Sequence, residues 1–134
     1  MSCETLIVRG KVFSSVGEGR KFVSLPWFRK QVEEIFGFKP YPGTLNLLLA
    51  DKDGENLAHL LKNKHGGHHV FPENGYFPGF LYKALIASKI LGAVVRPSVP
   101  NYPKNVLELI ASICLRKILK IKDGDEIEVE IWIG

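Results

Sequence analysis

Residues 126–133 alternate between charged and apolar side chains, with glutamates at 126, 128 and 130 and branched apolar residues at 127, 129 and 131. Successive side chains of a β-strand point to opposite faces, so this pattern predicts a strand with one buried and one wet face. Shorter segments rich in β-branched and apolar residues predict further strands at 5–13, 44–49, 92–95 and 106–111, and one or two strands at 76–90, broken by Pro78-Gly79.

The clearest helix predicted by the sequence follows Ser24. Ser24 is the expected N-cap, Pro26 lies near the first turn, an apolar stripe runs from Trp27 to Phe36, and Gly37 is the expected stop. A turn is expected at 51–54, followed by a short helix at 55–62, and another short helical piece is expected at 115–119. Residues 64–75 are expected to form an exposed loop. Many short strands with one good helix and no βαβ alternation predict a mainly β fold, a small β-barrel with helical insertions, as a single domain over residues 1–134.

Net charge of +4 and a pI of about 9.1 favour anionic partners. The basic residues near the C-terminus do not form a block, because Lys117, Lys120 and Lys122 alternate with apolar Ile118 and Ile121. Such spacing is typical of a solvated helix face and argues against nucleic acid as the main partner.

The two cysteines, Cys3 and Cys114, lie far apart and outside any CxxC pattern, which favours free thiols in a reducing cytoplasm. No apolar run reaches transmembrane length, and the N-terminus lacks the form of a signal peptide. A cytoplasmic protein without a membrane partner is therefore expected.

Two short segments carry the residues best suited to a nucleotide and a metal. In Gly17-Glu18-Gly19-Arg20, closely spaced glycines let backbone N–H groups approach an anion, and the arginine supplies a forked positive charge for phosphate. In Gly43-Thr44-Leu45-Asn46, Thr44 and Asn46 project to one side of a strand and offer neutral oxygen ligands suited to Mg²⁺. Taken singly, each segment is better explained without a ligand, the first as a glycine-rich hairpin turn and the second as polar residues at a strand start.

The two segments belong to a wider set of residues that together resemble one known family. These are GKVFSSVGEGRKFVSL at 10–25, FGFKPYPGTLNLLL at 36–49, GAVVRP at 92–97, Tyr102-Pro103, LELIA at 107–111, Leu115-Arg116 and KDGDE at 122–126. On these residues the chain resembles the archaeal CTP-dependent riboflavin kinases. The PYPGTLN motif is the most specific of them, whereas residues 52–76 match only loosely.

The resemblance implies a compact six-stranded cradle-loop barrel of the RIFT type. It implies a monomeric enzyme that uses Mg²⁺ and transfers phosphate from CTP to riboflavin, giving FMN and CDP. The implied metal ligands are Thr44 and Asn46, and Glu108 is implied on the flavin side. The implied nucleotide-binding residues are Ser15, Val16, Gly17, Glu18, Gly19, Arg20, Ile113, Cys114, Leu115 and Arg116.

The chain departs from the family pattern at several positions. Ser15 stands where the family usually has glycine, and Pro100 stands at the flavin-binding position where the family has threonine. Ser112 and Cys114 replace a proline and a basic residue near the nucleotide. Because proline has neither a hydroxyl nor a backbone N–H, the change at position 100 bears on the flavin pocket. It motivates one rival interpretation, a non-catalytic barrel that keeps a nucleotide- or flavin-binding cleft.

A second rival is a DNA-binding barrel, because related cradle-loop folds include transcription factors. Other candidates have simpler explanations. The run from His65 to His69 lacks acidic or cysteine partners at zinc spacing and fits an exposed loop. Asp123 and Asp125 flank Gly124 in a tight turn. The residues alone identify no general base, and Glu108 is the candidate to test first.

Overall fold

The computed structural model describes residues 4–14 and 22–134. Its strands are β1 (Thr5–Phe13), β2 (Leu45–Leu49), β3 (His68–Val70), β4 (Gly79–Ile86), β5 (Ile90–Pro97), β6 (Val106–Ile110) and β7 (Glu126–Trp132). Its helices are α2 (Pro26–Phe36), α3 (Asp51–Asn63) and α4 (Leu115–Leu119). The strands predicted at 5–13, 44–49, 92–95, 106–111 and 126–133 are confirmed to within a few residues.

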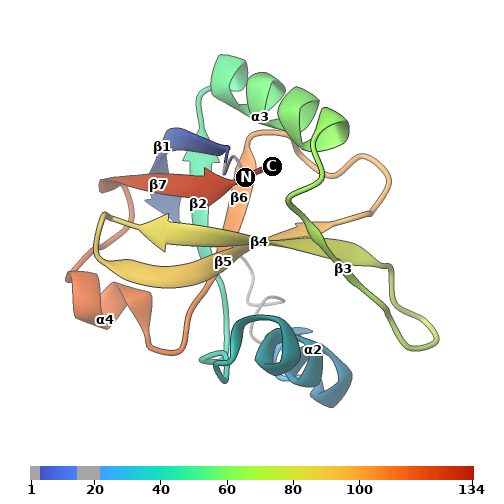
Figure 1. Cartoon of the computed structure of the whole chain (residues 1–134). Helices are drawn as coiled ribbons and strands as arrows, with labels where there is room; N and C mark the ends of the chain where they lie inside the picture. The colour runs from blue at the N-terminus through green and yellow to red at the C-terminus, as the bar shows by residue number, and fades with distance from the viewer. Residues whose placement is uncertain (1–3, 15–21) are drawn as a thin grey trace.

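The strands form one antiparallel sheet in the order β3-β4-β5-β6-β2-β1-β7. The second half of β4 also pairs with β7, with Ala84 opposite Ile131 and Ile86 opposite Val129, which closes six of the strands into a barrel. β3 pairs only with the first half of β4 and extends beyond the barrel (Figure 1). The predicted mainly β fold, a six-stranded barrel with helical insertions, is therefore confirmed.

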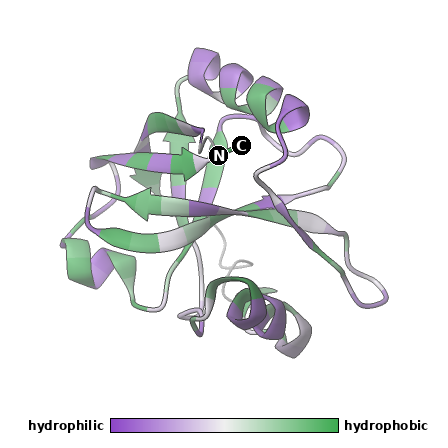
Figure 2. Ribbon diagram, in the orientation of Figure 1, coloured by the Kyte–Doolittle hydropathy of each residue, from purple (hydrophilic) through white to green (hydrophobic). Residues whose placement is uncertain are grey.

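Alternating side chains fill the barrel. Val8 and Val12 of β1 point inward, as do Val129 and Ile131 of β7, and these residues are almost fully buried. Gly10 lies between the two valines, and a Cβ there would come 2.9 Å from the Cβ of Leu47, so glycine lets β1 and β2 approach closely. Figure 2 shows apolar colour along much of the barrel strands and polar colour over much of α2 and α3.

Helices α2 and α3 lie on opposite sides of the barrel (Figure 1). Phe28 and Val32 of α2 join a second apolar cluster with Val70, Leu81 and other outward-facing residues of the sheet. Gly37 ends α2 as predicted, in the left-handed conformation and with its N–H donated to the carbonyl of Glu33. The predicted N-cap was wrong by one residue: Leu25 is the N-cap, because Pro26 fixes the first helical position.

Three other element predictions are corrected. The turn expected at 51–54 is the first turn of α3, where Asp51 and Asp53 favour a helix start. Gly54 serves close packing there, since its Cβ would lie 2.8 Å from the Cα of Asn105. The loop expected at 64–75 contains β3, anchored by buried Val70.

The break expected at Pro78-Gly79 is also corrected. β4 begins at Gly79 and runs unbroken to Ile86, and the chain reverses at Ala87 and Ser88. Both turn residues have positive φ, 52° and 57°. Turns of this kind usually carry Asn-Gly or Asp-Gly, so Ala-Ser gave no signal in the sequence.

Candidate active site

A polar cavity of about 430 Å³ opens where β2 begins, beside α4. Its floor includes Thr44 and Asn46, and one wall is formed by the segment that leads into α4. We call it the polar cavity; its lining residues are Phe13, Ser14, Tyr41, Pro42, Gly43, Thr44, Leu45, Asn46, Leu109, Ala111, Ile113, Cys114, Leu115, Arg116 and Lys117.

Thr44 and Asn46 converge in this cavity as their spacing predicted. The Thr44 hydroxyl lies 3.2 Å from Oδ1 of Asn46 and within donating distance of it. Asn46 is the buried polar side chain of the described core, at 7% exposure. Its strand position fixes it, because Asn46 pairs with Phe13 on β1 and with Glu108 on β6. Two neutral oxygens are thus held together where β2 begins.

Arg116 supplies positive charge to the polar cavity and is held in place from one side. Its guanidinium donates to Oδ1 of Asp123 at 2.9 Å and to the Ser14 hydroxyl at 3.2 Å. Ser14 in turn donates to the same carboxylate. The hydrogen bonds from Arg116 and Ser14 lower the pKa of the Asp123 carboxyl. Asp123 therefore acts as an anchor for Arg116, beyond the turn role expected from sequence.

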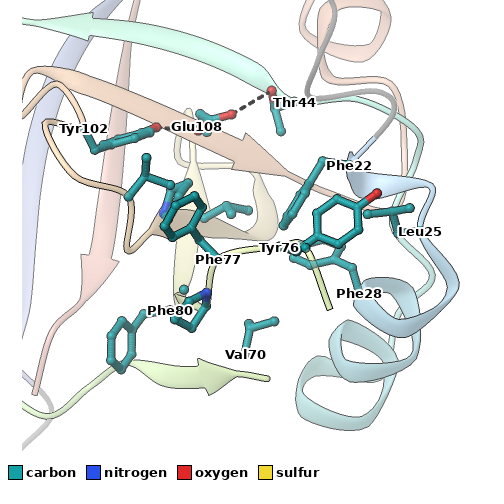
Figure 3. Close-up of a pocket in the computed structure, with 16 residues that line it drawn as sticks. Phe22, Leu25, Phe28, Thr44, Val70, Tyr76, Phe77, Phe80, Tyr102 and Glu108 are labelled. Carbon is teal, nitrogen blue, oxygen red and sulfur yellow. Dashed lines mark hydrogen bonds between the residues drawn. The ribbon is translucent and has the colours of Figure 1, made fainter. Parts of the chain in front are cut away.

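A second cavity, of about 560 Å³, lies on the other side of Thr44 (Figure 3). Aromatic and aliphatic side chains from α2, the segment before it, and the β3–β4 hairpin form most of its wall. We call it the aromatic cavity; its lining residues are Phe22, Leu25, Phe28, Thr44, Val70, Gly75, Tyr76, Phe77, Pro78, Gly79, Phe80, Val95, Pro97, Val99, Tyr102 and Glu108.

One carboxylate, Glu108, stands at the polar end of the aromatic cavity. Tyr102 donates a hydrogen bond from its hydroxyl to Oε2 of Glu108, and the Thr44 hydroxyl lies 3.5 Å from Oε1 (Figure 3). The Arg96 guanidinium lies over the Tyr102 ring, 5.5 Å from its centroid, and also reaches the carbonyl of Val106. The four side chains form a connected polar group at the edge of an otherwise apolar space.

Burial dominates the electrostatics of this group. It raises the pKa of Glu108, against the opposing effects of the hydrogen bonds from Tyr102 and Thr44 and the charge of Arg96. Burial and the neighbouring carboxylate raise the pKa of Tyr102, so its phenol stays a donor. Burial lowers the pKa of Arg96. Glu108 is thus a desolvated carboxyl group that faces a cavity.

Comparison with known proteins decides the family. The family model for CTP-dependent riboflavin kinase, described as Domain of unknown function DUF120, matches residues 12–131. This chain belongs to the CTP-dependent riboflavin kinase family. The predicted resemblance is therefore confirmed, and both cavities lie within the matched residues.

Three proteins named riboflavin kinase illustrate the relationship. The one from Ignicoccus hospitalis is 41% identical over 127 residues, which cover 93% of this chain and 70% of that protein. The one from Methanocella arvoryzae is 37% identical, over 93% of this chain and 56% of that protein. The one from Sulfurisphaera tokodaii is 33% identical, over 99% of this chain and 100% of that protein.

Within this family framework the structure brings together most of the predicted site residues that it describes. Ile113, Cys114, Leu115 and Arg116 line the polar cavity with Thr44 and Asn46, and Glu108 lines the aromatic cavity. The predicted glycine segment, Ser15 to Arg20, lies outside the described residues. For all of these site residues, the assignments to nucleotide, metal and flavin stay predictions.

Pro100 lies in an exposed turn closed by the hydrogen bond from the Tyr102 N–H to the Val99 carbonyl. Its neighbours Pro97, Val99 and Tyr102 line the aromatic cavity, and Pro100 is not among the described lining residues. The turn therefore presents the Tyr102 hydroxyl, not the residue at position 100, to Glu108.

Sequence reasoning missed several lining residues. Tyr102 was noted only as part of the matching pair Tyr102-Pro103. Lys117 was interpreted as solvated, and it is exposed, but it also lines the polar cavity. The aromatic wall was not predicted. Its signal was available in Tyr76-Phe77-Pro78, an aromatic pair in a turn-rich segment, where an exposed loop has little use for two large rings.

The histidine run and Cys114 have the following surroundings in the described part of the chain. His68 packs edge-on against Phe36, and the His69 ring packs against Phe71 and Phe80. Within residues 4–14 and 22–134, no three His, Cys, Asp or Glu side chains gather as a metal site. Cys114 is a half-buried free thiol. No helix in the same ranges has the length and apolar character needed to cross a membrane.

Proposed function

We propose that this chain is a CTP-dependent, Mg²⁺-dependent riboflavin kinase. The observation that carries the proposal is that an aromatic cavity and a polar cavity meet at one side chain, Thr44. Such an arrangement suits a reaction between a flat, largely apolar acceptor and a charged phosphate donor. The family membership and the names of the relatives support riboflavin and CTP as that pair.

Riboflavin fits the aromatic cavity. A volume of about 560 Å³ lies within the range of small-molecule sites, and aromatic walls suit a planar ring system. Phe22, Tyr76 and Phe77 lie at the apolar end, whereas Thr44 and Glu108 lie at the polar end (Figure 3). We therefore orient the ring toward the β3–β4 hairpin and the terminal ribityl hydroxyl toward Thr44.

The polar cavity suits the phosphates of the nucleotide. Arg116 and Lys117 offer positive charge, and no Asp or Glu is found among the described residues that line this cavity. Thr44 Oγ1 and Asn46 Oδ1 are hard, neutral oxygens 3.2 Å apart, a donor pair that fits Mg²⁺ when phosphate oxygens and water complete its shell. Bound there, Mg²⁺ would neutralise charge on the transferring phosphate.

The reaction forms a bond between the terminal ribityl oxygen and the γ-phosphorus and breaks the bond from that phosphorus to the bridging oxygen of CDP. The hydroxyl loses one proton. Glu108 is the carboxylate among the described residues of the aromatic cavity, so we assign it to accept the hydrogen bond of that hydroxyl and to take its proton. Arg116 and Thr44 position the donor side. Such positioning supplies most of the catalysis in phosphoryl transfer.

A steady-state assay tests the proposal. Riboflavin, Mg²⁺ and CTP are expected to give FMN and CDP in equal amounts, and ATP, GTP and UTP serve as comparison donors. Absence of FMN with every donor would contradict the kinase assignment and favour the non-catalytic barrel. FMN formation with a donor other than CTP would correct the donor alone. We further expect a cytoplasmic monomer, which size-exclusion chromatography of the purified chain checks in part.

A further inference from the structure

The Thr44 hydroxyl has one proton and two acceptors within reach, one from each cavity. Asn46 Oδ1 lies 3.2 Å from it on the side of the polar cavity, and Glu108 Oε1 lies 3.5 Å from it on the side of the aromatic cavity. A hydroxyl donates a single hydrogen bond at a time. The proton of Thr44 therefore serves one cavity or the other, and Thr44 is the residue that lines both.

The frame around this hydroxyl is rigid. Asn46 and Glu108 are directly opposed in the β2–β6 ladder, and Asn46 is buried. Tyr102 already donates to Oε2 of Glu108, so a hydrogen bond from Thr44 would hold the other oxygen, Oε1. Movement of the proton between its two acceptors needs rotation about one side-chain bond of Thr44 and no movement of the strands.

We propose that Thr44 couples the two sites by this choice of acceptor. The inference rests on the proposed function, in which Thr44 Oγ1 and Asn46 Oδ1 both turn lone pairs toward a cation. A Thr44 hydroxyl that does so must direct its proton away from the cation and from Asn46, which leaves Glu108 Oε1 as the acceptor. Glu108 is then held by hydrogen bonds at both oxygens, with its remaining lone pairs free for the ribityl hydroxyl.

The consequence is positive coupling between the nucleotide–metal complex and the flavin. Glu108 is ordered before riboflavin arrives, so less ordering remains to be done when riboflavin binds. Coupling is reciprocal, so riboflavin strengthens the binding of the nucleotide–metal complex by the same factor. The site assembles for transfer only when the metal, the nucleotide and the acceptor are together.

Riboflavin titrations followed by flavin fluorescence test this, because they need no turnover. The unreactive nucleotide CDP is used, in three arms: protein alone, protein with saturating CDP and Mg²⁺, and protein with CDP and a chelator. Mg²⁺ with CDP is expected to tighten riboflavin binding by roughly 5-fold or more, within the usual range of coupling between sites. CDP with chelator is expected to leave it unchanged.

Thr44→Val and Thr44→Ser are the matched variants. Valine keeps the shape and removes the hydroxyl, so the coupling factor falls to about one; serine keeps the hydroxyl and the coupling. Coupling that persists in Thr44→Val overturns the inference, as does a wild-type protein that binds both ligands without coupling. If Thr44→Val no longer binds CDP, the inference is tested by the wild-type titrations with and without chelator. Tightening of riboflavin binding by CDP that persists in the presence of the chelator overturns the inference. A wild-type protein that binds neither ligand refutes the proposed function instead.

Discussion

The aromatic cavity and the polar cavity share Thr44 but are built from different parts of the fold. The polar cavity rests on β1, β2 and β6 of the barrel and on α4, and its hydrogen bonds fix Arg116 and Asn46. The aromatic cavity takes much of its wall from α2 and the β3–β4 hairpin, where Phe77 is 55% exposed. The polar cavity therefore rests largely on barrel strands, whereas the aromatic cavity depends on a peripheral hairpin.

The largest effect is expected on the polar side, from Asn46→Ala. Loss of an oxygen ligand to the metal should lower Mg²⁺-dependent kcat/KM by about 100-fold or more, since even indirect supports of metal sites are worth 10–100-fold. Asn56→Ala, on the exposed face of α3, is the matched control. Riboflavin affinity without nucleotide should stay within about twofold of wild type. Unchanged turnover in Asn46→Ala would remove Asn46 from the metal site.

Glu108→Gln tests the boundary between the cavities. Glutamine keeps the size and an acceptor for Tyr102 but removes the charge, and hydrogen bonds to charged groups are worth about 1.5–3 kcal/mol. Riboflavin affinity should therefore fall roughly 10-fold or more. Isothermal titration without nucleotide measures this effect, and Glu126→Gln on β7, an exposed glutamate, is the control. Equal affinity in both variants would show that Glu108 does not contact the flavin.

Phe77→Ala tests the aromatic side. Aromatic contacts contribute about 0.5–1.5 kcal/mol, so riboflavin affinity should fall by roughly 2- to 10-fold with nucleotide affinity unchanged. Phe71→Ala is the matched control, because Phe71 lies in the same hairpin region and is similarly exposed, 67% against 55%, but does not line the cavity. If the two variants lose riboflavin affinity equally, the hairpin acts through stability and not through contact.

The smallest effect is expected from Asp123→Asn, which removes the anchor of Arg116. The pKa of Asp123 is lowered in the folded state, so its carboxylate stabilises the fold above the ordinary value of 3.8 and ceases to do so as the pH falls through the lower folded value. The melting temperature of wild type should exceed that of the variant slightly at pH 7, and the difference should vanish in acid. Glu73→Gln, at another exposed carboxylate, controls for loss of one charge. A difference that grows in acid would contradict this sign.

The barrel strands were predictable from their enrichment in β-branched and apolar residues, and β7 also from an alternation that reflects burial on one face. β1 and β7 follow this pattern closely, with inward Val8, Val12, Val129 and Ile131. Short elements were less predictable. Gly54 resembles a turn residue but permits a close approach of α3 to Asn105, and β3 depends on pairing with a strand ten residues farther along the chain. Such tertiary causes leave little trace in local sequence.

The candidate site divides in the same way. Strand spacing predicted only that Thr44 and Asn46 project to one side, and the family resemblance singled out these two residues and Glu108 as site residues. The link between them was not predictable from spacing, because it depends on the β2–β6 register that places Asn46 opposite Glu108. The role of Tyr102 depends likewise on a turn that directs its hydroxyl toward Glu108. The assignments to metal, nucleotide and flavin stay predictions.

The central claim is that two ligands occupy two separate cavities that meet at Thr44. Riboflavin titrated into protein saturated with CDP and Mg²⁺ tests it most directly, with calorimetry to give the stoichiometry. One riboflavin per chain is expected, bound at least as tightly as in the absence of nucleotide. Competition, with riboflavin affinity falling in proportion to CDP concentration, would place both ligands in one cavity and contradict the account.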